Sequence, residues 1–289
     1  MSAGCTVGDG SVRRSRGAVR SRGAVRSRRA VDGPGPRPDP APGASVADAP
    51  GVRIGAVDGI GTLDEDERTR CLVEAEAHAA ELFAEIGRRG LIAPGRLESE
   101  VSRAVRDLGA EQFGTSRHWH KRVVRSGENT LQPYAENPPD RTIAGDDIVF
   151  VDLGPVFAEW EADVGRTFVL GDDPRKHRLA ADLPRVWEAG RAFFDTHPDV
   201  TGEELYAHVC GLAREAGWEF GGAHSGHLVG EFPHELIDAE RLHSYITTGN
   251  DTPMHRAVDA SGRRCHWILE VHLVDREHRI GGFFEQLMR

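Results

Sequence analysis

The spacing of apolar side chains predicts four helices in the chain from residue 53 onward. The first helix is predicted over residues 63–90, where acidic residues occupy the first turn and an apolar stripe that includes Leu72 and Ile86 follows. A second stripe of the same period predicts a helix over residues 96–109. Both stripes are bordered by charged positions, so each helix is expected to bury one face.

Two more helices are expected after a central region of strands. They cover residues 183–196 and 201–216. The second begins with Thr201 and Glu204 at the spacing of a capping box, and it ends before Gly217. Apolar, β-branched runs predict a strand within residues 120–127, a hairpin after it, and further strands from residue 221 to the C-terminus. The order of helices, strands, helices and strands favours an α+β fold.

Two carboxylates stand in the expected hairpin. Asp152 directly follows an apolar run, and Asp163 comes eleven residues later. If the chain turns at residues 157–158, the two aspartates fall opposite each other on one face of the sheet. Like charges repel there, and burying an unpaired carboxylate costs several kcal/mol, so a positive group is expected between them. Arg166 in a buried ion pair and a divalent metal ion are the two alternatives.

Further acids and histidines occur in similar surroundings in the second half of the chain. Two glutamates lie within or next to apolar runs that predict strands, namely Glu270 in WILEVHLVD and Glu285 in GGFFEQL. Two histidines lie in a glycine-containing segment, His227 and His234 in SGHLVGEFPHE. Four carboxylates carry a charge of −4, which two divalent cations balance. Oxygen-rich coordination with one imidazole suits Mn, Fe, Co or Zn in a hydrolytic pair of metals.

Composition is that of an ordinary water-soluble chain. Hydrophobic residues make up 39% and charged residues 28% of the 289 residues. No run of about 18 apolar residues occurs, so no membrane span or membrane partner is expected. The four cysteines are scattered without CxxC spacing, which predicts reduced thiols and a cytoplasmic location.

Residues 1–52 differ from the rest of the chain. A six-residue repeat of Ser, Arg and Gly is followed by Pro/Gly-rich sequence, which cannot bury enough apolar surface to order itself. We therefore expect a disordered arm over 1–52 and one folded domain over 53–289. A nucleic-acid-binding arm and a targeting leader are the alternatives, although no apolar segment follows Arg13 and Arg14.

Charge is divided unevenly between arm and body. Residues 1–50 hold nine Arg and four Asp, a net +5, so the remainder must carry −15 for the chain to reach −10. An acidic body argues against nucleic acid as a partner of the folded domain.

These motifs resemble the pita-bread metallopeptidases, which include methionine aminopeptidase, aminopeptidase P, prolidase and creatinase. Metal ligands in that family follow the order Asp, Asp, His, Glu, Glu. The matching residues are Asp152 in VDLG, Asp163 in DVGRT, His227 in GHLVGEFPHE, Glu270 in LEVH and Glu285 in FFEQL. The resemblance covers about residue 64 to the C-terminus. It implies the pita-bread fold, a curved antiparallel sheet with helices on its outer face.

The resemblance also implies how the metals are held. Asp152 would chelate one metal, Asp163 and Glu285 would bridge both, and His227 and Glu270 would complete the other site. Manganese is the expected metal, with Co, Fe and Zn as alternatives.

Catalytic roles follow from the same resemblance. A water between the two metals would be the nucleophile, and Glu270 would shuttle its proton. His234 would hydrogen-bond the developing oxyanion. Arg166 would then be structural or support the ligands rather than pair with the aspartates.

The expected substrate site departs from the family pattern. Tyr134 follows Pro133 in SGENTLQPYAENPPD, where the family has a substrate-binding His. Tyr134 is therefore expected to line the substrate site. His120, or its neighbour His118 in RHWHKR, is a candidate replacement for the missing His.

Other departures are smaller. Val271 follows Glu270 where the family usually has Pro, and the extra N-terminal domain of aminopeptidase P and creatinase is not expected from residues 1–52. His224 and His272 lie near the ligands in sequence, and both are expected to be structural.

We therefore expect a dinuclear metal hydrolase that cleaves an amide or peptide bond, of aminopeptidase or dipeptidase type. Its partner would be a peptide or small amide substrate, and a homodimer is the assembly to test. A creatinase-like hydrolase of a small non-peptide C–N bond is one alternative. A non-catalytic metal-binding relative that acts as a binding protein is the other, although the intact ligand set argues against it.

Overall fold

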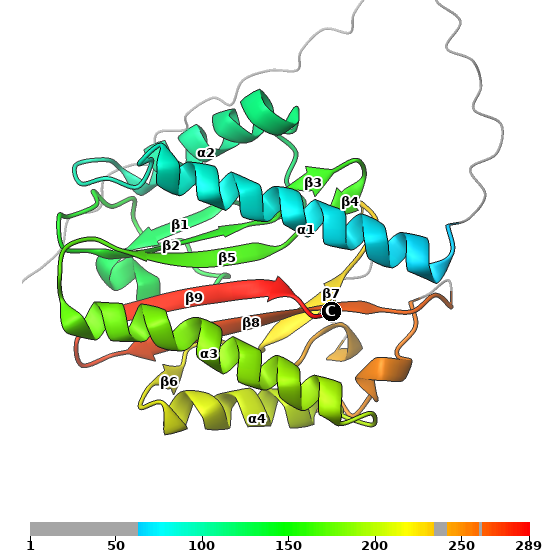
Figure 1. Cartoon of the computed structure of the whole chain (residues 1–289). Helices are drawn as coiled ribbons and strands as arrows, with labels where there is room; N and C mark the ends of the chain where they lie inside the picture. The colour runs from blue at the N-terminus through cyan, green and yellow to red at the C-terminus, as the bar shows by residue number, and fades with distance from the viewer. Residues whose placement is uncertain (1–62, 234–241, 260–261) are drawn as a thin grey trace, which may run out of the picture. The chain divides into compact units, whose positions relative to one another are not determined.

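The computed structural model describes residues 63–233, 242–259 and 262–289 (Figure 1). All of these residues belong to one compact unit, Val57–Arg289. The expected disordered arm and His234 lie outside the described residues.

Four α-helices occur in the described part of the chain, as predicted: α1 (Glu65–Arg88), α2 (Glu98–Phe113), α3 (Pro174–Thr196) and α4 (Gly202–Glu215). Capping boxes begin α1 at Asp64 and α4 at Thr201, the second at the predicted position. The predicted start of α3 at residue 183 was wrong, because Pro184 lies inside the helix. The helix begins at Pro174 and is capped by Asp173, whose side chain accepts a hydrogen bond from Arg175 N at 2.8 Å.

Antiparallel strands form one large sheet and one small one. The large sheet has the order β1-β2-β5-β9-β8-β6, with β7 also paired to β8, and the small one joins β3 and β4. The strands are β1 (Val123–Ser126), β2 (Ile148–Leu153), β3 (Val156–Phe157), β4 (Trp160–Glu161), β5 (Val164–Val169), β6 (Glu219–Phe220), β7 (Gly226–Val229), β8 (His266–Asp275) and β9 (Ile280–Leu287).

The hairpin from β2 to β5 forms, but its turn lies one residue later than predicted. Ala158 and Glu159 form the two-residue turn with φ of 46° and 71°, the left-handed pair that matches the twist of a hairpin. Asp152 therefore pairs with Gly165 rather than with Asp163. The slip in register is two residues, an even number, so both aspartates still share a face.

Helices cover one face of the sheet, where α1 contacts β5 and β9, and α3 contacts β5, β8 and β9 (Figure 1). Val149, Val151 and Leu153 of β2 belong to the hydrophobic cluster of α1 and α2. Asp152 lies between two of them in sequence, so it faces the opposite side of the sheet. A second cluster packs α3 and α4 against β8 and β9. The expected α+β class, with helices on one face of the sheet, is confirmed.

Two further findings concern the cysteines and the helices of the described ranges. Cys71, Cys210 and Cys265 are free thiols. No helix between residues 63 and 289, outside the two gaps, is long and apolar enough to cross a lipid bilayer.

Candidate active site

Strand register places acids in a row across the face that the helices leave open. Asp152 pairs with Gly165, Gly165 with Glu285, and Glu285 with Glu270. Directly paired residues point to the same face, so the three carboxylates project together from β2, β9 and β8. Gly165 allows Phe283 and Glu285 to pack closely over it, since an added Cβ there would lie 2.5 Å from Phe283 Cδ1 and 3.1 Å from Glu285 Cβ.

Asp163 and His227 complete the group. Asp163 stands two residues before Gly165 and shares its face. His227 of β7 brings Nε2 to 3.1 Å from Asp163 Oδ2 and 3.7 Å from Glu285 Oε1. Its Nδ1 lies 2.8 Å from the Leu228 carbonyl oxygen, to which it donates when protonated. In the neutral ring, Nε2 then carries the lone pair and can bind a metal on the side of the acids. The structure thus brings together all five expected ligands, which are far apart in the sequence.

His120 reaches the same carboxylates from the segment before β1. Its Nε2 lies 3.1 Å from Asp163 Oδ1 and 3.6 Å from Asp152 Oδ1. The adjacent Trp119 fixes this segment, because its backbone N–H donates to Gly154 O at 2.9 Å and its indole N–H donates to Ala162 O at 3.1 Å.

These groups line a cavity of about 120 Å³. It is bounded by Trp119, His120, Tyr134, Asp152, Asp163, His224, His227, Tyr245, Glu270 and Glu285. Aromatic rings and acids therefore both contribute to the lining of the cavity.

Burial and the neighbouring carboxylates oppose ionisation of Asp152 and Glu285. Burial raises the pKa of Asp152 to about 7, against the opposing effect of His120, and it raises that of Glu285 well above the usual range. Burial also opposes ionisation of Asp163, yet the imidazoles of His120 and His227 hold its pKa below the ordinary value.

The two histidines show the reciprocal effect. Burial opposes a charge on either ring, but the neighbouring carboxylates, Asp163 foremost, raise the pKa of His120 and of His227 to about 9. Protons on these rings therefore supply the positive charge that the acids require when no cation is bound.

The donor set fits a pair of divalent cations. Two groups bring ligand atoms within 4.8 Å of one another: His120 with Asp152 and Asp163, and Asp163 with His227 and Glu285. They share Asp163, whose two oxygens face different histidines. Asp152 Oδ1 and Glu270 Oε1 are buried without a hydrogen-bond partner, and carboxylate oxygens of this kind are suitable metal ligands.

The structure excludes the alternative in which Arg166 pairs with the two aspartates, because Arg166 pairs with Val151 on the other face of the sheet. It donates to Glu285 O and Gln286 Oε1, both at 2.7 Å, and lies over Phe284. These contacts agree with the structural role expected of it.

The expectation for His224 was wrong, because His224 is near the site in space as well as in sequence. Its Nδ1 lies 2.5 Å from Glu270 Oε1, although the angle is not that of a hydrogen bond. Trp119 and Tyr245 also line the cavity, and they were missed because a lone aromatic residue carries no motif. The only sequence feature that could have pointed to Trp119 is its position directly before His120 in RHWHKR.

The remaining candidates divide between the cavity and the core. Tyr134 lines the cavity and is 47% exposed, and its ring meets that of His120 edge-on at 5.7 Å. His118 does not line the cavity. His272 is buried with Nε2 at 2.8 Å from Thr130 O, and burial lowers its pKa to about 4, which agrees with a structural role.

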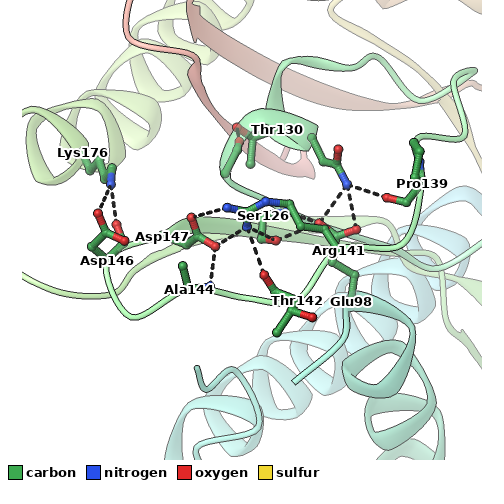
Figure 2. Close-up of polar contacts among 12 residues, drawn as sticks. Glu98, Ser126, Thr130, Pro139, Arg141, Thr142, Ala144, Asp146, Asp147 and Lys176 are labelled. Carbon is green, nitrogen blue, oxygen red and sulfur yellow. Dashed lines mark hydrogen bonds and ion pairs between the residues drawn. The ribbon is translucent and has the colours of Figure 1, made fainter. Parts of the chain in front are cut away.

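A buried polar network positions the loop that carries Tyr134 (Figure 2). The Glu98 carboxylate accepts from Ser126 N at 2.6 Å, from Ser126 Oγ at 2.8 Å and from Asn129 Nδ2 at 3.0 Å. Arg141 closes the other end of the loop through Asp147 and Ser126 Oγ. Both ends of this loop are therefore tied to buried groups.

Comparison with known proteins gives one family. The model of metallopeptidase family M24 matches residues 70–257, more than half of the chain. A Xaa-Pro dipeptidase from Pyrococcus furiosus is 30% identical over 146 residues, which are 50% of this chain and 41% of that protein. The chain thus spans well under two thirds of that relative's length.

Solved structures agree on the fold. An X-Pro aminopeptidase from Thermotoga maritima matches with a TM-score of 0.61 at 19% identity, over 77% of this chain and 58% of that one. A dipeptidase from Mycobacterium ulcerans matches with a TM-score of 0.59 at 23% identity, over 78% and 55%. The expected pita-bread fold is confirmed.

Proposed function

Because this chain belongs to metallopeptidase family M24, we propose that it is a dinuclear metal-dependent hydrolase that cleaves an amide bond in short peptides. One observation carries the proposal. Asp163 offers one carboxylate oxygen to each of two imidazoles, and each imidazole faces a further buried carboxylate. This arrangement suits a bridging ligand between two cations rather than an isolated ion pair.

The metal ligands in this proposal are Asp152, Asp163, His227, Glu270 and Glu285. Their four carboxylates balance two divalent cations, and manganese suits a set dominated by carboxylate oxygens. Such a pair, when bound, lowers the pKa of a bridging water so that it can act as the nucleophile at neutral pH, and it polarises the scissile carbonyl.

Proton transfer is assigned to Glu270, with His224 beside it. Glu270 Oε1 has no hydrogen-bond partner and lies 2.5 Å from His224 Nδ1. A carboxylate with a free lone pair next to an imidazole can accept a proton from water and pass it to a leaving amine. His234 remains the proposed donor to the oxyanion, on the family resemblance.

The cavity favours a small substrate. Its volume of about 120 Å³ and its lining by Trp119, Tyr134 and Tyr245 suit the part of a short substrate that lies beside the acids. The relative from Pyrococcus furiosus is named for Xaa-Pro dipeptides. We therefore propose dipeptides with Pro in the second position as the first class to test, with cleavage of amino-terminal residues from longer peptides as the alternative.

The test is hydrolysis by the full chain loaded with Mn²⁺. Its panel holds Xaa-Pro dipeptides, Xaa-Ala dipeptides, peptides with Pro second, and small amidines and ureas, with new products read by mass spectrometry. Asp163→Asn should abolish turnover, whereas Asp172→Asn, at an exposed position, should leave it unchanged. Turnover of amidines or ureas alone would instead assign a creatinase-like activity.

Two further outcomes bear on this proposal. Metal bound without turnover of any compound in the panel would indicate a binding protein. Turnover that persists in Asp163→Asn would overturn the assignment of the site. Light scattering on the same sample tests the expected homodimer.

A further inference from the structure

We infer that His120 is a sixth metal ligand, which binds through Nε2 the cation held by Asp152 and Asp163. The inference rests on the metal pair proposed above and adds a residue to it. The five-ligand pattern gives the Asp152 end of the site no imidazole, and the alternative role of His120 is a substrate contact.

The first argument is the near-symmetry of the two histidines about Asp163. His120 Nε2 lies 3.1 Å from Oδ1 and 3.6 Å from Asp152. His227 Nε2 lies 3.1 Å from Oδ2 and 3.7 Å from Glu285. Since His227 stands at a ligand position, His120 occupies the equivalent place at the other end of the shared carboxylate.

The second argument is the orientation of the ring. His120 Nδ1 lies 2.7 Å from the carbonyl oxygen of Lys121, the next residue, just as His227 Nδ1 lies 2.8 Å from that of Leu228. A neutral ring that donates from Nδ1 to a carbonyl carries its lone pair at Nε2, where a metal can bind. This is the arrangement that metal-binding histidines commonly adopt.

The third argument is distance. Ligands at about 2.1 Å from a metal stand roughly 3.0 to 3.4 Å apart in octahedral or tetrahedral geometry. The separations of 3.1 and 3.6 Å between His120 Nε2 and the two aspartates lie at or just beyond that range. A small shift of one ring therefore completes the coordination.

The surrounding residues hold the ring in this place. Gly154 leaves the space that the ring fills, since an added Cβ would overlap the ring and lie 2.5 Å from Trp119 Nε1. The His120 side chain is only 8% exposed. Tyr134, which meets the ring edge-on, is the more exposed of the two and so the better placed to contact substrate.

One imidazole at each metal changes the expected metal preference. Imidazole suits Co, Fe and Zn, whereas a site built of carboxylates alone suits Mn. Loss of the His120 imidazole should therefore weaken Co²⁺ binding more than Mn²⁺ binding, by about tenfold or more at one site.

The decisive experiment counts imidazoles on bound Co²⁺ in the full chain. X-ray absorption at the cobalt edge of the protein with two cobalt ions should give one imidazole per metal, with no variant needed. Proton NMR of the same sample should show two strongly shifted signals that exchange in D₂O, one from each Nδ1–H. His120→Gln should lose one of them and retain the signal of His227, which also reports that the site is folded.

Two variants separate a ligand from a neighbour. His118→Gln, at the histidine two residues away that does not line the cavity, should keep both signals. Gly154→Ala should weaken one signal by displacing the ring while leaving its imidazole in the chain. One half imidazole per metal in the native chain, or two signals in His120→Gln, would overturn the inference and leave the proposed function standing. Failure of the native chain to bind cobalt would overturn the proposed function itself.

Discussion

Glu76 on α1 should make the stability of the protein fall as pH rises towards neutrality. Its side chain is 6% exposed, and Oε2 is buried without a hydrogen-bond partner. Burial raises its pKa from 4.5 to about 7, although Arg289 and Arg166 oppose the rise. The folded chain therefore holds a proton that the unfolded chain has released.

The sign follows from this difference in pKa. The stability that Glu76 contributes in its protonated form is fully present below the unfolded pKa of 4.5, and it is lost as pH rises through the folded pKa of about 7. A rise of that size corresponds to about 3 kcal/mol, which is an upper value because the two arginines and partial solvent access reduce it. We expect about 1–3 kcal/mol of unfolding free energy to disappear between pH 4.5 and 7.

Glu76→Gln removes this titration and keeps the shape of the side chain. Urea denaturation of the full chain in chelator at pH 5 and pH 8 would compare it with the native chain and with Glu74→Gln, an exposed position on the same helix. The Glu76 variant should gain stability relative to the native chain as pH rises, and the Glu74 variant should not. A stability difference that is the same at both pH values, or that shrinks with pH, would refute the reasoning.

Other expectations address the site and its supports. Asp163→Ala should remove most of about two bound metals per chain, measured by elemental analysis, because Asp163 belongs to both ligand groups. The prediction would be contradicted if elemental analysis found no metal in the native chain and if Mn²⁺, added to a chelator-treated sample, left the melting temperature unchanged. Tyr134→Phe should reduce turnover roughly three- to tenfold by removing one hydrogen bond to substrate; unchanged kinetics would exclude that contact. Glu98→Ala should cost about 3 kcal/mol in denaturant unfolding, because it leaves Ser126 N–H and the Asn129 amide buried without an acceptor; a loss below about 1 kcal/mol would show that water replaces the carboxylate. Deleting residues 1–50 should leave melting temperature and turnover unchanged, and a loss of several degrees would show that these residues stabilise the body.

The sequence predicted elements whose signal is local. Helices α1 and α4 each have an apolar stripe and a capping box, which can be recognised in the sequence. Each expected ligand lies in a short motif within or next to an apolar strand. The start of α3 was missed because a proline normally marks a helix boundary, whereas Pro184 lies within a helix held by packing on β8 and β9. Local signals thus gave element types better than element limits.

Long-range pairing could not be predicted in the same way. The turn at Ala158 and Glu159 places two residues other than Gly at positive φ, so no turn signature marks the hairpin register. The approach of His224 and His120 to the acids depends on β7, β8 and the contact of Trp119 with Gly154. No spacing within the sequence encodes those contacts.

The row that joins Asp152, Gly165, Glu285 and Glu270 has a kinetic consequence. Its two ends form in the hairpins β2-β5 and β8-β9, which lie far apart in the sequence, so the row is complete only after the non-local pairing β5-β9 has formed. Pairings of such sequence separation are slow steps of folding. A ligand that binds the row therefore finds no site in a partly folded chain. It should slow unfolding and leave the rate of folding nearly unchanged.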